Sequence, residues 1–383
     1  MGSKIGVANS LPESLIFDEI LARLPVKTLV RFKTVCRGWY FAITSPEFAR
    51  VHLAFSYLRQ VFLINISERN IRSLYLLPYK DVDDDEGLVK FVTKYYQSLT
   101  LVGCCNGIVC LCLRDRRNCF KKFILANPAT REYREIDNLC GDYDVKAFGF
   151  GYVSSIDDYK IAVVYCDSNE KVNHVYTFSL ETGTWKQVVA NIAGEDVNKF
   201  EGGYSSFYNN KIYWKNHRFM KDGKRDKFVF SIDLITEKWE EYPWINGLSP
   251  YVHVDLVVLQ DRLAFIGEVS CQNYSDVWMI DEAGDWNIWN KVFSVDLGYG
   301  RRFLNVSDSG IYLALVHWDQ LELIYPSSGP SRQSPQSTYW FKRGLSLVKK
   351  TGFYYDTFIS PFGKIAHSGA EISCKQLEPN PKQ

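Results

Sequence analysis

Cysteine is the residue whose spacing comes nearest to reactive chemistry in this 383-residue chain. Half of its ten cysteines gather between positions 104 and 119, where thiolates could bind zinc. No second cysteine pair and no His-x-x-x-His motif stands at ligand spacing, which favours small buried side chains over a metal site. A reducing compartment would also keep thiols out of disulfides. We therefore expect neither metal nor disulfide at Cys104, Cys105, Cys110 and Cys112.

Other signatures of catalysis are missing from the sequence. The glycines within 103–107 and 148–151 precede no helix and no Gly-Lys-Ser/Thr, so they predict no phosphate cradle. No Gly-x-Ser-x-Gly elbow occurs, and the six histidines are scattered. The sequence thus predicts no catalytic residue, no cofactor and no metal, although a fold can bring distant residues together.

Charge gives no electrostatic reason for binding nucleic acid or an anionic membrane. Lysine plus arginine number 45 against 44 for aspartate plus glutamate, a formal net charge of +1. The acidic run 81–86 is most simply a solvated loop. The longest apolar stretch, 99–113, is interrupted by glycines and is too short to cross a bilayer. With no targeting segment visible, we expect the protein in the cytoplasm, with the nucleus as a second site.

The first elements along the chain are short helices between residues 11 and 53. Leu15, Ile16, Ile20, Leu21 and Leu24 recur at helical spacing, and Pro25 ends that helix. A second helix follows to Val35, and a third runs through Trp39 to Pro46, which ends it. Three such helices cannot enclose a core of their own. Periodicity leaves open whether they cap the rest of the chain or dock on helices of another protein.

Several stretches of this segment match one family in register. Residues 11–13, 20–21, 23–27, 29–32 and 35–39 closely resemble an F-box, with Arg37 where lysine is more usual. The resemblance implies docking on a Skp-type adaptor, which hangs from a cullin scaffold. The residues expected at that interface, or in the helix packing behind it, are Leu11, Pro12, Ile16, Ile20, Leu24, Pro25, Leu29, Val35 and Trp39.

Beyond residue 60 short runs rich in Val, Ile, Tyr, Phe and Trp alternate with turn residues, which is typical of strands. A unit of strand, tight turn and aromatic residue recurs about every fifty residues, at Tyr133, Trp185, Trp239 and Trp286. A period of this length indicates a β-propeller, with room for roughly six blades. We expect the three tryptophans at equivalent positions, each buried against a neighbouring blade.

The same region carries a second resemblance. Residues 103–110, 127–131, 148–152 and 157–160 are similar to the plant F-box-associated domain and, more distantly, to kelch-type propellers. Residues 354–361 look like the C-terminal strand of S-locus F-box proteins of pollen. That narrower resemblance implies a secreted ribonuclease as the target.

Together these patterns predict a mainly β chain with a small α-helical N-terminal module. The expected domains are a three-helix F-box at 10–54, a propeller of roughly six blades at 60–365 and a disordered tail at 366–383. The resemblances imply a non-catalytic substrate-recognition subunit of a cullin-based (SCF-type) ubiquitin ligase, whose propeller captures a target protein. The alternative is a propeller that binds or converts a ligand such as a carbohydrate, independently of ubiquitination.

Overall fold

The fold is described from a computed structural model of the chain. It describes residues 11–55, 60–68, 71–78, 89–91, 98–114, 120–137, 139, 144–167, 172–192, 199–219, 225–248, 251–269, 274–296, 301–306, 312–316, 320–324, 335–340, 345–355, 357–361 and 375–376. The acidic run 81–86 and Cys119 lie outside this part. Within it, no helix is long and apolar enough to cross a membrane.

The N-terminal module contains one helix more than the sequence predicts. Its elements are η1 (Leu15–Ile20) continued by η2 (Leu21–Arg23), α1 (Val26–Phe32), α2 (Arg37–Thr44) and α3 (Pro46–Ala54). Pro25 separates η2 from α1 with an extended backbone. Pro46 follows the end of α2 as expected, but it also begins α3, because proline suits the first turn of a helix. The side chain of Ser45 caps that turn by accepting a hydrogen bond from the Phe48 N–H.

The remaining strands form six antiparallel sheets, which we number as blades 1 to 6. Blade 1 contains β24 (Leu345–Tyr355), β1 (Gln60–Glu68), β2 (Ile71–Pro78) and β3 (Val89–Phe91). Blade 2 contains β4 (Ser98–Cys105), β5 (Ile108–Arg114), β6 (Phe120–Asn127), β7 (Glu132–Asp137) and β25 (Lys375–Gln376). Blade 3 contains β8 (Asp144–Val153), β9 (Asp158–Asp167), β10 (Val172–Ser179) and β11 (Thr184–Ile192).

Blade 4 contains β12 (Lys199–Tyr208), β13 (Lys211–Phe219), β14 (Arg225–Asp233) and β15 (Trp239–Pro243). A short helix, η4 (Asn246–Leu248), leads to blade 5, with β16 (Tyr251–Leu259), β17 (Arg262–Val269), β18 (Tyr274–Ile280) and β19 (Trp289–Asp296). Blade 6 contains β20 (Arg301–Val306), β21 (Tyr312–Val316), β22 (Gln320–Ile324) and β23 (Pro335–Trp340).

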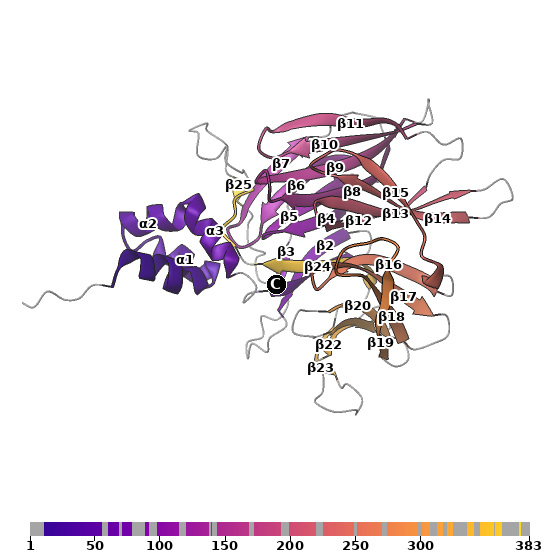
Figure 1. Ribbon diagram of the computed structural model, residues 1–383. Coiled ribbons are helices and arrows are strands. Elements are labelled where there is room, and N and C mark those ends of the chain that lie inside the picture. Colours follow the sequence, from indigo (N-terminus) through magenta and orange to yellow (C-terminus); the bar gives the residue numbers. More distant parts are fainter. Residues whose placement is uncertain are drawn as a thin grey trace, which may run out of the picture.

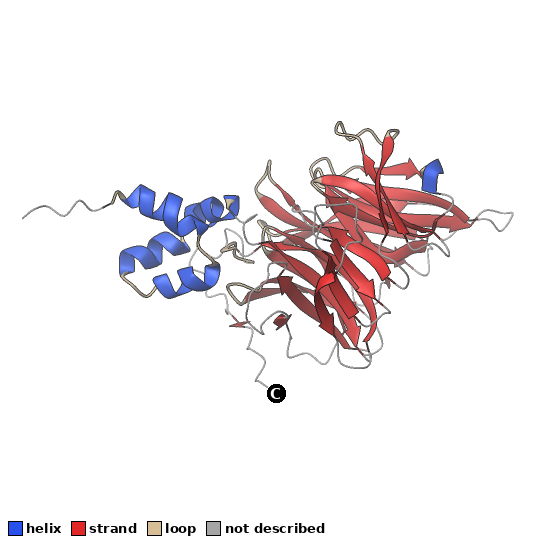
Figure 2. Ribbon diagram, turned by 90° about the horizontal axis from the view of Figure 1, so that it is seen from below, coloured by secondary structure: helices blue, strands red, loops and turns tan. Residues whose placement is uncertain are grey.

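The six blades close into a ring, so the predicted propeller of roughly six blades is confirmed (Figure 1). Strand β4 contacts β8, β8 contacts β12 and β12 contacts β16, while β20 contacts β18 and β24, and β24 returns to β4. Blade 1 closes the ring by pairing β24, from late in the chain, with β1, for example Tyr354 opposite Val61. The helices stand outside this β domain, with α3 nearest to it (Figures 1 and 2).

The blades pack face to face through apolar clusters. Val163 and Phe178 of blade 3 join the core shared with blade 2, and Val164 of blade 3 faces Trp214 of blade 4. Gly151 of β8 shows how close these faces come, because a Cβ atom there would lie 2.2 Å from the Phe207 ring of β12. The glycines of this stretch therefore serve strand packing, which agrees with the absence of a phosphate cradle in the sequence.

In blades 2 to 5 the recurrent aromatic residue lies at or beside the start of the fourth strand in chain order, which is β7, β11, β15 or β19. In blade 5 this residue is not the one that the sequence predicted. The pairs across the last hairpin are Ala126 with Tyr133, Phe178 with Trp185, Ile232 with Trp239, and Ile280 with Trp289. The fourth equivalent residue is thus Trp289, and the choice of Trp286 was wrong. The reason is a longer turn between β18 and β19, in which Trp286 lies.

The tryptophans also differ in burial. Trp185 Nε1 donates a hydrogen bond to the Asp137 carbonyl at 3.3 Å, and Trp286 Nε1 donates to that of Pro243 at 3.1 Å, so both link neighbouring blades. Trp239 stacks on Phe230 of its own blade and is 42% exposed. The prediction that Trp239 is buried between blades was therefore wrong, because one ring face stays open to solvent.

The region predicted as a disordered tail, 366–383, contains one described element. Strand β25 pairs with β7, placing Lys375 opposite Tyr133 and Gln376 opposite Glu132. An outer strand offers unpaired backbone groups, which a passing segment can satisfy. The disordered tail expected at 366–383 stays a prediction outside these two residues. The rest of 366–383 lies outside the described residues.

Candidate functional site

The helical module exposes apolar side chains well beyond what its own core needs. Within the described residues, seven large apolar side chains of this module are between 44% and 68% exposed. We call them the exposed apolar set, and they are Leu11, Leu15, Ile20, Val30, Val35, Tyr40 and Phe41. They lie on or before η1, on α1 and α2 and in the turn between these two, and none lies on α3. Exposed apolar residues concentrated in one small unit indicate an interaction surface.

The residues predicted for partner binding separate into two groups. Leu11, Pro12, Ile20, Pro25 and Val35 are exposed. Ile16, Leu24 and Trp39 are partly buried and Leu29 is fully buried, so these four pack the module from inside. Contact of either group with a partner stays a prediction. Four residues of the exposed apolar set were not predicted for partner binding: Leu15, Val30, Tyr40 and Phe41. Apolar residues beside the buried stripe of a helix are nevertheless visible in the sequence.

The interior of the module holds the exposed set in place. Leu21, Val26, Leu29 and Ile43 are buried together. The Trp39 ring meets Phe17 and Phe32 edge to face, at centroid distances of 5.9 Å and 5.5 Å. A buried side chain from α3, His52, places Nε2 3.0 Å from the Leu24 carbonyl oxygen. These contacts make η1, α1, α2 and α3 one small packed unit.

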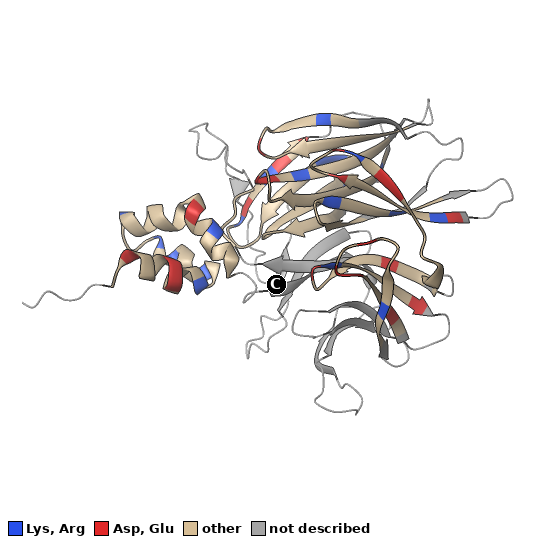
Figure 3. Ribbon diagram, viewed as in Figure 1, with Lys and Arg blue, Asp and Glu red and all other residues tan. Residues whose placement is uncertain are grey.

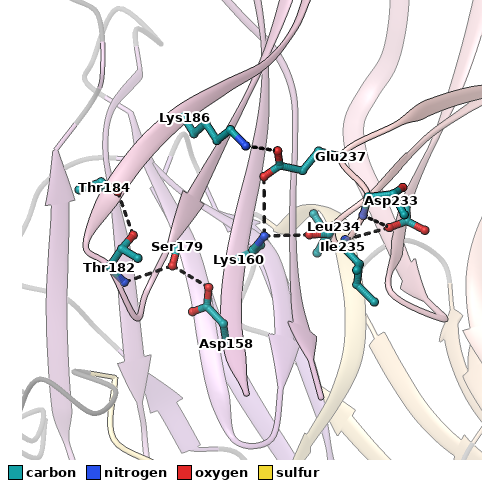
Figure 4. A network of polar contacts seen from close by, with 11 residues as sticks. Asp158, Lys160, Ser179, Thr182, Thr184, Lys186, Asp233, Leu234, Ile235 and Glu237 are labelled. Carbon is teal, nitrogen blue, oxygen red and sulfur yellow. Dashed lines mark hydrogen bonds and ion pairs between the residues drawn. The ribbon is translucent and has the colours of Figure 1, made fainter. Parts of the chain in front are cut away.

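Charged side chains of the propeller are engaged in contacts within and between blades (Figure 4). Lys160 of blade 3 is buried and donates a hydrogen bond to the Leu234 carbonyl of blade 4 at 2.8 Å. Glu237 of blade 4 lies 3.9 Å from the same amine and also binds Lys186. Nearby, Asp158 accepts the Ser179 hydroxyl at 2.6 Å. These groups stabilise the ring and its turns.

An aromatic seam lies between blades 4 and 5. Trp286 stacks on Tyr242 at 4.3 Å and on Tyr213 at 6.1 Å. Burial raises the pKa of both tyrosines, which keeps their hydroxyls protonated at neutral pH. Hydrogen bonds from Lys211 and Tyr242 hold the pKa of Glu240 below its usual range. The seam therefore offers stacked rings and a paired carboxylate, with no poised acid or base.

Nothing in the described part of the chain gathers metal ligands. No group of three or more His, Cys, Asp or Glu side chains there could hold an ion. Cys110 and Cys112 are buried in β5, while Cys104 and Cys105 are partly buried at the end of β4, the strand that pairs with β5. The expected absence of metal stays a prediction. In the coloured part of Figure 3, acidic and basic residues are scattered over the helices and strands, and neither sign forms one large region.

Comparison with known proteins agrees with this two-part architecture. Residues 9–50 match the F-box domain, and residues 62–315 match the F-box associated beta propeller domain. An F-box/kelch-repeat protein of Arabidopsis thaliana is 25% identical over 92% of this chain and 96% of its own length. The F-box protein CPR1 of the same plant is 26% identical over 73% of this chain and 72% of its own.

Solved structures show only distant likeness. A chain of the nidogen/laminin complex is 8% identical, covering 78% of this chain and 99% of its own, with a TM-score of 0.45. The β-propeller domain of the Trilobed protease from Pyrococcus furiosus is 14% identical, covering 63% of this chain and 85% of its own, with a TM-score of 0.35. Neither score carries an argument about function. The family matches, by contrast, show that the chain belongs to the plant-type F-box proteins with an F-box-associated β-propeller domain.

Proposed function

We propose that this protein is the substrate-recognition subunit of a cullin-based ubiquitin ligase. Its F-box docks on a Skp-type adaptor, and its propeller holds a target protein. The observation that carries the proposal is the exposed apolar set, which sits on the helices away from α3 in a chain with an F-box domain. Such a surface is costly in water and is satisfied when a partner helix covers it.

In this arrangement the protein performs no chemistry itself. The propeller acts by keeping an acceptor lysine of the target near a charged conjugating enzyme, which raises the effective concentration of the reacting groups. The described polar groups of Figure 4 support this division, since they are engaged in contacts that hold the ring together. The alternative, a carbohydrate-binding or enzymatic propeller, has no specific observation in its favour.

The finer parts of the proposal concern place and target. We place the protein in the cytoplasm, with the nucleus as a second site. The target remains an unidentified protein. The secreted ribonuclease implied by residues 354–361 stays a prediction that rests on the S-locus resemblance alone.

Alanine substitution of two exposed residues, followed by measurement of adaptor binding, provides the test. Ile20 and Val35 are 48% and 61% exposed, so replacing both by alanine leaves the core of the module intact. Loss of interface anchors of this kind costs about 2 kcal/mol or more, which corresponds to roughly a thirtyfold weaker complex. Affinity of the full chain for a purified Skp-type adaptor, measured by calorimetry, checks the effect.

The matched control is Ile235→Ala with Val292→Ala, two propeller residues of similar exposure. This control should bind the adaptor as the unmodified chain does. If Ile20→Ala with Val35→Ala binds equally well while retaining its helical circular dichroism, the docking surface has been misplaced. If the unmodified chain fails to bind the adaptor, the proposed function is wrong.

A further inference from the structure

A short segment near the end of the described chain lies between the propeller and the F-box module. Residues 357–361 follow β24, whose end points toward α3 (Figure 1). We call residues 357–361 the coupling segment. Thr357, Phe358 and Pro361 are buried, and Ile359 and Ser360 are partly buried. A segment so well covered after the last strand of a closed ring has a structural task beyond closing it.

One side chain of blade 2 holds this segment from the propeller side. Asn127 is fully buried, and its Nδ2 donates hydrogen bonds to the carbonyls of Thr357 and Ile359, each at 2.8 Å. Its Oδ1 accepts the Ala129 N–H at 2.9 Å, which shapes the turn after β6. The Thr357 hydroxyl donates to the Asn106 carbonyl at 2.8 Å. Buried hydrogen bonds of this kind are expensive to lose, because the abandoned groups cannot reach water.

The F-box side of the segment is apolar. The Phe358 ring lies 5.3 Å from the His52 ring and 6.2 Å from the Phe48 ring, both on α3. The Lys33 ammonium lies 4.8 Å from the centre of the Phe358 ring, and burial lowers the pKa of Lys33. Phe358 is therefore part of the core of the helical module, although it lies about 300 residues further along the chain.

The next residue extends that core into the blades. Ile359 packs against the helical cluster and also against the cluster shared by blades 2 and 3. Ala129 likewise touches the helical cluster and the inner cluster of blade 2. Apolar packing thus runs without a break from the helices into the propeller. Cores that share side chains move together, since packed interiors do not deform continuously.

A polar contact adds a second tie at the same junction. Arg50 of α3 meets the Asp157 carboxylate at 3.1 Å, and the Tyr152 hydroxyl donates to the other carboxylate oxygen at 2.7 Å. Arg50 is more than half exposed, so this ion pair contributes little to stability. The ion pair does help to orient the helical module relative to the propeller, because it joins α3 to the turn between β8 and β9.

From these contacts we infer that the coupling segment locks the F-box module and the propeller into one rigid body, with Asn127 and Phe358 as its positioning residues. Under the proposed function, on which this consequence rests, the lock sets the distance between a captured target and the conjugating enzyme. A loose connection would spread acceptor lysines over a large volume and lower the effective concentration of each. A fixed one favours the few lysines that lie at the right distance.

Ring closure does not require this segment, which makes the inference testable in the full chain. The pairing of β24 with β1 reaches Tyr355, before the segment begins. Phe358→Ala removes the ring shared with α3. Asn127→Asp keeps the acceptor for the turn and removes both donors to the segment. A chain ending at residue 355 removes the segment together with β25, and Val292→Ala is the control for loss of an exposed apolar side chain.

Small-angle X-ray scattering measures the coupling without any assumption about ubiquitination. Residues 55–59 between α3 and β1 reach at most about 18 Å when fully extended, so release should lengthen the maximum dimension by less than this span. We expect this change for Phe358→Ala, Asn127→Asp and the shortened chain, and none for Val292→Ala. Propeller circular dichroism should be retained in the two point variants. Unchanged scattering in folded variants would overturn the inference.

A reconstituted ligase separates the coupling from the docking. With adaptor, cullin and conjugating enzyme present, the propeller's own lysines serve as acceptors and are mapped by mass spectrometry. Asn127→Asp, which leaves the apolar core of the helical module untouched, should bind the adaptor as before, lose modification severalfold at the preferred lysines and spread it over more sites. An unchanged pattern together with altered scattering would contradict the positioning role. Absence of adaptor binding in every chain would contradict the proposed function and leave the scattering result standing.

Discussion

The two regions of this protein cover their large apolar side chains to different degrees. In the helical module Phe41 is 68% exposed, whereas in the propeller Trp214 is 1% exposed and donates its Nε1 hydrogen to the Phe148 carbonyl at 3.0 Å. A ring of six sheets covers its own faces, because each blade lies against two neighbours. A few short helices cannot do so. The difference teaches that a ring of sheets covers its own apolar faces, whereas the helical module leaves seven large apolar side chains exposed.

Truncating the buried residue of this pair, Trp214, should have the largest effect on stability. Trp214 lies between blades 3 and 4, so Trp214→Ala should lower the free energy of unfolding by about 3–5 kcal/mol through loss of contacts and a cavity. Phe41→Ala should leave stability nearly unchanged. Urea denaturation of the full chain measures both. Equal losses for the two variants would break the comparison.

Two glycines, one in each region, test the same difference in packing at the level of the backbone. In the propeller, Gly151→Ala places a Cβ atom 2.2 Å from Phe207, which should cost about 1–3 kcal/mol through overpacking. In α2, the nearest atom to a Cβ at Gly38 is the Cys36 sulfur at 3.9 Å. Gly38→Ala should therefore stabilise the helix, by up to about 1 kcal/mol, because alanine is the better helix former. Thermal unfolding of both variants checks the opposite signs.

The smallest expected effect depends on pH and lies within blade 5. Burial opposes the charged form of Asp276, but hydrogen bonds from Lys291, Ser294 and Tyr251 outweigh it and hold the pKa of Asp276 below its usual range. A lowered pKa in the folded state stabilises the protein above the unfolded pKa near 4, and this contribution is lost as the pH falls further.

Asp276→Asn is the variant that isolates this group, because it keeps the shape and removes the titration. Its free energy of unfolding should be lower than that of the unmodified chain at pH 7, and the difference should shrink between pH 5 and pH 3. Denaturation at a series of pH values provides the measurement. A difference that stays constant with pH would assign the effect to packing.

The predictable features are those that repeat or persist over a local stretch. The apolar spacing from Leu15 to Leu24 and the stop at Pro25 predicted helices, and aromatic residues about fifty positions apart predicted blades. Register inside one hairpin was harder. Trp286 and Trp289 both fit the repeat, and the choice between them depends on the length of a turn that only pairing with β18 reveals.

The sequence alone determined that short helices precede a run of strands and that the strands form a repeating ring, because these follow from the period of the apolar residues. Only the tertiary structure decided which apolar residues of the module stay exposed, since burial depends on what packs against each helix face. It also decided the role of Phe358. That residue completes a helical core more than 300 positions earlier in the chain, and ring closure brings it there by returning β24 to β1.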